Sequence, residues 1–191
     1  KNICQTFDGL NNGSNSTSQL QLITQSIQSF LESVDNFHLY LLFIISNSEI
    51  SQKHKILSLI IIYRTYQSMD QILLPEFINF SLPILQQSLF SQNTEISHLS
   101  AAIISSFISY IGIDFFSEFI LNIINFLQST ETAFQVFYLF QEITQHSLRL
   151  PNEILLIFSE FLESNQFHFQ ALSIFLNVLL HSPLGEIDNT I

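Results

Sequence analysis

Residues that break helices are scarce in this chain of 191 residues, which has only 4 Gly and 4 Pro. So few turn-forming residues argue against a fold with many tight turns and favour long helices joined by short loops. Cys4 is the only cysteine, which excludes an intrachain disulfide and a thiolate metal cluster. The chain is therefore suited to a reducing compartment.

Positive charge is also scarce. The sequence has 5 Lys and Arg against 16 Asp and Glu, for a net charge of −11. Nucleic-acid phosphates are bound mainly by Lys and Arg, so we expect no nucleic-acid partner. An acidic surface attracts a basic protein partner. Acidity also has a simpler explanation, that it keeps an apolar chain soluble, and both explanations stay open.

No hydrophobic run is long enough to suggest a membrane span. The best uncharged stretch, residues 99 to 113, falls short of the roughly 20 apolar residues that a spanning helix needs. Its serines lie between apolar positions at helical spacing, which favours a packed helix, and Asp114 follows it. The N-terminal segment is rich in Asn, Ser and Thr and has no apolar core, so we expect no signal peptide.

The sequence contains helix-start signals that repeat at similar intervals along the chain. They stand 33, 43, 36 and 35 residues apart, at Ser18, Ser51, Thr94, Thr130 and Asn165. Each begins an apolar pattern of helical period, and a second such pattern fits before the next signal. A helix pair repeating at this period is typical of an α-solenoid, in which each unit buries its apolar face by stacking on its neighbours.

We therefore predict an all-α protein, an α-solenoid of antiparallel helix pairs of the HEAT or ARM type. It would have nine helices in about four and a half repeats, bounded at 18–48, 51–90, 94–128, 130–164 and 165–182. Residues 1–17 are expected to form a poorly ordered segment or a partial helix and a loop. Residues 183–191 are expected to form a tail.

Individual residues predict where some of these helices begin and end. Gly112 is predicted to end one helix and Asp114 to cap the next, while Pro151 suits a first turn. Pro83 lies inside a helical pattern, where proline costs about 3 kcal/mol. We therefore expect the helix either to restart at Ser81 or to kink there.

No motif in the sequence indicates catalysis. The six histidines are scattered singly, without the HxxxH or HExxH spacing of a zinc site, and no GxSxG or GxxxxGK[ST] motif occurs. Glu160 and Glu163 are close enough on a helix to suggest an acid–base pair, but they suit a solvated face better. We expect no enzyme activity, no cofactor and no metal.

The second helices carry a polar stripe. Glu118, Asn122 and Asn125 follow one another at i, i+4 and i+7, and Glu153 and Glu160 repeat the seven-residue spacing. Because second helices line up on one side of a stacked array, we predict that these five residues form a protein-binding strip. The alternative is an ordinary solvated face, which every amphipathic helix has.

Three segments resemble the N-terminal HEAT repeats of importin-β family nuclear transport receptors, and most closely those of transportins. The segments are SQLQLITQSIQSFLESVDNFHLYLLFIISN (18–47), HKILSLIIIYRTY (54–66) and FSEFILNIINFLQSTETAFQVFYLFQEITQHS (116–147). The likeness lies in helix order and apolar pattern. Phe116 stands where family members have Trp, and Ser117 and Leu121 stand where they have Pro.

The resemblance implies a function. In such receptors the N-terminal repeats bind the GTP form of the small GTPase Ran through their inner second helices. Grooves on the convex face bind Phe-Gly repeats of the nuclear pore, and cargo is held mainly toward the C-terminus. The chain is therefore expected to be a nuclear import receptor fragment of the cytoplasm and nucleus. The alternative is a HEAT scaffold that assembles a protein complex without a GTPase.

Overall fold

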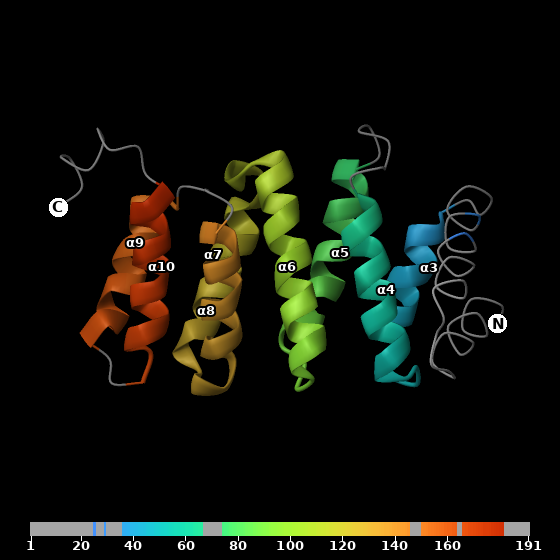
Figure 1. The fold of residues 1–191 in the computed structure, drawn as a ribbon, viewed down its shortest axis with the longest axis horizontal. Coiled ribbons are helices and arrows are strands. Elements are labelled where there is room, and N and C mark those ends of the chain that lie inside the picture. The colour runs from blue at the N-terminus through green and yellow to red at the C-terminus, as the bar shows by residue number, and fades with distance from the viewer. Residues whose placement is uncertain are drawn as a thin grey trace. The chain divides into compact units, whose positions relative to one another are not determined.

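The computed structural model describes residues 36–66, 74–145, 150–163 and 166–181, and the single helical positions 25 and 29. Within these ranges it contains eight α-helices and no strand, so the all-α prediction is confirmed (Figure 1). The helices are α3 (Phe37–Ser46), α4 (Gln52–Thr65), α5 (Leu74–Leu89), α6 (Thr94–Ile111), α7 (Ser117–Ile124), α8 (Thr130–Gln145), α9 (Asn152–Ser159) and α10 (His168–His181). Three 3₁₀ turns accompany them: η2 (Ile113–Phe116), η3 (Asn125–Gln128) and η4 (Glu160–Glu163).

The start signals at Ser18 and Asn165, residues 1–17 and the tail at 183–191 lie outside the described residues. The described part of the chain belongs to two compact units, Lys1–Ile84 and Leu85–Ile191, and the boundary between them in the sequence falls within α5.

Helix α5 runs through Pro83 as one helix, so of the two predicted alternatives the restart at Ser81 is wrong and the kink stays a prediction. The side chain of Ser81 is buried inside the helix, where its hydroxyl donates to the carbonyl oxygen of Ile78 at 3.0 Å. Proline removes the backbone bond to the carbonyl four residues earlier, here that of Asn79. Both Pro83 and Asn79 are exposed, so water can satisfy that carbonyl and the helix continues.

In the first unit, α3 packs on α4 around the fully buried side chains of Leu41, Leu42 and Leu59. The start signal at Ser51 is confirmed, because its side chain accepts a hydrogen bond from the backbone N–H of His54.

In the second unit, α8 packs between α6 and α10, and the three helices lie side by side (Figure 1). On its inner side α8 buries Phe137 and Phe140, whose rings lie 5.3 and 4.8 Å from that of Phe158 on α9. Phe137 also stacks on Phe167, just before α10, at 5.2 Å. Large aromatic side chains bury much apolar area, so this cluster fixes α9 and α10 against α8.

One arrangement, which we call the joint, occurs three times in this unit: a small, buried residue in the first turn of a helix that contacts the element before it. The backbone N–H groups of Ser97, Ala133 and Ala171 each bond to the carbonyl four residues earlier, and all three side chains are buried. Each lies in the first turn of a helix that contacts the end of the preceding element. The Ser97 hydroxyl donates to the Leu89 carbonyl at 2.6 Å, α8 contacts η3, and α10 contacts η4. A buried side chain in the first turn beside another element has little room, which favours a small residue.

Boundary signals around α6 have mixed outcomes. Thr94 begins α6 as predicted, but the capping residue is Asn93, whose side chain accepts from the N–H of Ile96 at 3.1 Å. Gly112 ends α6 with φ 111°, confirming that prediction. The predicted cap at Asp114 is wrong. Asp114 lies within η2, and α7 begins after Phe116 without a side-chain cap.

Helices α7 and α9 of this unit are both shorter than their patterns predict. Helix α7 ends at Ile124 and tightens into η3, and α9 ends at Ser159 and tightens into η4. Tightening of the last turn is common where terminal carbonyls lack partners within the helix. The two helices therefore end in the same way, 35 residues apart.

Candidate interaction surface

The five residues of the predicted strip are all exposed to solvent. Glu118 and Asn122 lie on α7, Asn125 begins η3, Glu153 is in the first turn of α9, and Glu160 begins η4. None of them is used in the core. The structure therefore leaves this polar face of α7 and α9 exposed to solvent.

The opposite side of each second helix holds it in place. Ile120 and Ile123 of α7 and Ile154 and Phe158 of α9 are each at most 5% exposed. Since these side chains point into the core, the polar residues on the other side of the same helices must face outward. Ile123 and Phe158 lie 35 residues apart and are both fully buried. Each helix therefore turns this position of its sequence toward the core.

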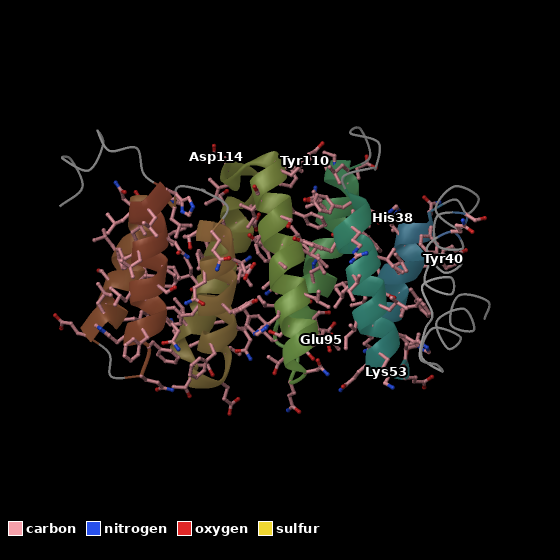
Figure 2. The ribbon with its side chains drawn as sticks, in the orientation of Figure 1. His38, Tyr40, Lys53, Glu95, Tyr110 and Asp114 are labelled. Atoms are coloured by element: carbon pink, nitrogen blue, oxygen red, sulfur yellow. The ribbon has the colours of Figure 1, made fainter. Side chains whose placement is uncertain are left out.

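The second unit is acidic throughout its described part, which contains no lysine or arginine. Its acidic residues are Glu95, Asp114, Glu118, Glu131, Glu142, Glu153, Glu160 and Glu163. Figure 2 shows that acids lie at both ends of α6, with Glu95 at its start and Asp114 just beyond its end. The described part of this unit therefore has a net negative charge.

Two leucines stand out beside the acids. Leu121 is 61% exposed and Leu156 is 67% exposed. Each follows a glutamate by three residues, so Glu118 with Leu121 on α7 and Glu153 with Leu156 on α9 form the same exposed Glu-x-x-Leu motif. We call these two motifs together the Glu–Leu pair. Single exposed leucines are ordinary, but two at matching positions of α7 and α9 make this face a candidate interaction surface.

Sequence reasoning missed these leucines, although a signal existed. Placing residues 117–128 on 152–163 aligns the glutamate and the leucine of each motif, and also Phe126-Leu127 with Phe161-Leu162. Such a 35-residue register identifies Leu121 and Leu156 as equivalent positions. Apolar pattern alone treats both as candidates for the core.

Known proteins provide no guide to this surface. No family model, curated protein or solved structure matches the chain. Among the described residues, no group of His, Cys, Asp or Glu is placed to hold a metal ion. Nor does that part of the chain contain a helix of the length and apolarity needed to cross a bilayer.

Among the described residues, burial shifts the pKa of His38 and of Tyr138, and neither residue belongs to the predicted strip. His38 on α3 lies 3.2 Å from the hydroxyl of Thr65 on α4, and burial lowers its pKa. Tyr138 on α8 is partly buried, which raises its pKa, and the neighbouring Glu142 carboxylate raises it further. Both groups join helices to one another, which indicates a structural role.

Proposed function

We propose that the chain is a non-catalytic helical-repeat protein that binds a protein partner through its second helices. The observation that carries this proposal is the Glu–Leu pair, the same acid and the same exposed leucine on α7 and on α9. Stacked repeats present extended surfaces of this kind for binding. An acidic, leucine-bearing surface suits a partner with basic and apolar side chains.

The architecture we infer for it is a stack of antiparallel helix pairs of the HEAT or ARM type, with about four and a half repeats. Three features support this proposal: the position of α8 between α6 and α10, the joint that recurs at Ser97, Ala133 and Ala171, and the 35-residue register of α7 and α9. Each repeat in such a stack contacts only its neighbours.

The specific form of the proposal is a nuclear import receptor fragment of the importin-β or transportin type. It rests on the resemblance of segments 18–47, 54–66 and 116–147. The partner is then Ran in the GTP form, and the protein acts in the cytoplasm and nucleus. Phe-Gly repeats of the nuclear pore would be further partners, and cargo would bind mainly through regions outside this chain.

The mechanism would be linkage between two binding events. A partner on the second helices changes the curvature of the stack, and the changed curvature alters the affinity for another partner. A stack held together only by contacts between neighbours bends at many small joints, so modest binding energy is sufficient.

A pull-down with Ran loaded with GTP or with GDP tests the specific form. We expect the immobilised chain to retain the GTP form and not the GDP form. Equal retention of both, or no retention by a chain whose circular dichroism shows folded helices, contradicts it. Binding to a protein partner without any nucleotide preference supports the alternative scaffold, because the Glu–Leu pair requires only basic and apolar groups.

A further inference from the structure

We propose that α10 is a dimerisation helix, which packs antiparallel to α10 of a second copy of the chain. The inference goes beyond the proposed function and does not depend on it, because α10 contains no residue of the Glu–Leu pair. The contact surface is a stripe of exposed apolar side chains on this one helix. We call it the α10 stripe, and its residues are Phe169, Leu172, Leu176 and Leu179.

Helix α10 is held in place by its other side. Ala171 and Ile174 are fully buried, and α10 packs on α8, α9 and η4. On the α10 stripe, Phe169 is 80% exposed, and Leu176 and Leu179 are 49% and 51% exposed. Covering these side chains removes apolar area from water, which favours association.

The spacing of the α10 stripe fits a helix as the partner. Its residues follow one another at intervals of three, four and three residues, which is the spacing of the a and d positions of a heptad. Side chains at these positions pack into the spaces between those of a second helix. Helix α10 has 14 residues and is about 21 Å long, so the stripe extends over most of its length.

The same spacing makes the α10 stripe complementary to itself. In an antiparallel pair related by a two-fold axis at the level of Ile174, Phe169 of each copy faces Leu179 of the other. Leu172 of each copy likewise faces Leu176 of the other. All four positions of the stripe are therefore paired in a dimer of identical chains.

Charge favours a second copy over other partners. The described part of the second unit has eight acidic residues and no Lys or Arg, whereas α10 has no Asp, Glu, Lys or Arg. Two copies of an acidic chain repel each other, and an uncharged helix lets them meet with the least repulsion. Helices that lie on membranes are rich in Lys and Arg on their polar face, so α10 does not suit an anionic membrane.

The size of the contact limits its strength. One helix of 14 residues from each copy gives an interface below roughly 1,200 Å², which is the range of transient complexes. The dimer should therefore be weak, with a Kd of about 10–500 μM.

Sedimentation equilibrium of the full chain at about 10–500 μM tests the inference. We expect the average mass to rise with concentration from that of one chain, 22.0 kDa, toward that of two. Leu172→Glu with Leu176→Glu should weaken the dimer about tenfold or more, because it places like charges opposite each other. Leu121→Glu with Leu156→Glu adds the same two negative charges outside α10, and should weaken the dimer less than about twofold.

Two further variants complete the test. Leu172→Lys with Leu176→Glu places unlike charges opposite each other in an antiparallel pair, but like charges in a parallel one. We expect it to dimerise at least about fivefold more strongly than Leu172→Glu with Leu176→Glu. If circular dichroism shows that the two glutamates unfold α10, Leu172→Ser with Leu176→Ser repeats the comparison without added charge.

Three outcomes overturn the inference. A chain that stays monomeric at every concentration, with normal circular dichroism, would mean that a different partner, a membrane or residues 183–191 cover α10. Weakening by the α10 variants that is no greater than that by the control variant would mean that the contact lies elsewhere. A charge-paired variant that dimerises no more strongly than Leu172→Glu with Leu176→Glu would exclude antiparallel packing.

Discussion

The imidazole ring of His98 on α6 lies flat against the phenol ring of Tyr138 on α8, with ring centroids 3.8 Å apart and planes 7° from parallel. The contact joins two helices that also pack along their lengths. Stacked rings of this kind contribute about 0.5–1.5 kcal/mol beyond the area they bury. We therefore expect this pair to add directly to the stability of the α6–α8 interface.

A double-mutant cycle on His98→Ala and Tyr138→Ala measures that contribution. Urea denaturation followed by circular dichroism should give a coupling free energy of about 0.5–1.5 kcal/mol. His181→Ala on α10, combined with Tyr138→Ala, provides the control and should show additive effects. Additive losses for His98 and Tyr138 as well would contradict a stabilising stack.

The phenol of Tyr138 provides a second prediction. Burial raises its pKa, and the charge of Glu142 and its hydrogen bond raise it further. Glu142→Gln removes the negative charge and leaves the burial, so the pKa should fall but stay above the ordinary value for tyrosine, about 10. The difference between ultraviolet titrations of the protein with Tyr138 and with Tyr138→Phe isolates this group, and an unchanged pKa would exclude the role of Glu142.

The imidazole of His38 predicts how stability depends on pH. Burial lowers its pKa below the ordinary value of 6.5, so between the two values the unfolded chain binds more protons than the folded one. The contribution of this group to the free energy of unfolding is therefore complete above pH 6.5 and is lost as the pH falls toward the lowered pKa. His38→Gln should flatten this part of the profile. Equal slopes for the protein and His38→Gln would contradict the assignment.

Phe158 is predicted to be a main support of the second unit. It is fully buried, and its ring contacts those of Phe137 and Phe140. Phe158→Ala should lower the free energy of unfolding by about 3–5 kcal/mol, because it removes apolar contacts and leaves a cavity. Phe169→Ala is the control, since Phe169 is 80% exposed and should cost less than about 0.5 kcal/mol. Similar losses in the two variants would argue against the packing described.

Gly112 is predicted to be needed for its backbone conformation. Its φ is 111° and its ψ is 149°, a combination that almost only glycine adopts. A Cβ at this position meets no heavy atom within 4 Å, so Gly112→Ala should cost about 1–3 kcal/mol from backbone strain alone. Gln87→Ala on an exposed part of α5 is the control for thermal unfolding. A neutral Gly112→Ala would mean that the turn relaxes freely.

Much of the helical framework could be predicted because its signals are local. The cap at Ser51 and the end of α6 at Gly112 depend on a few neighbouring residues, and both predictions are confirmed. The shift of the α6 cap from Thr94 to Asn93 shows the limit of such signals. Two adjacent residues can both cap, and the packing of the helix decides between them.

The surface could be predicted only in part. The helical spacing of its five polar residues predicts that they share a polar face, and the structure exposes all five. The exposure of Leu121 and Leu156 could not follow from hydropathy, because a leucine that faces a partner and a leucine that faces the core look alike. The ends of α7 and α9 were missed for a related reason, since the tightening of a last turn depends on what lies next to it.

The small side chains at Ser97, Ala133 and Ala171 affect how variants of the protein would unfold. A bulky replacement at Ala133 would push the start of α8 away from η3, yet the contacts between α9 and α10 would remain in place. In the stack of helix pairs proposed above, damage of this kind spreads no further than the neighbouring helices, because each repeat contacts only its neighbours. Unfolding of such variants should then proceed in stages along the chain, with separate transitions, and not in one cooperative step.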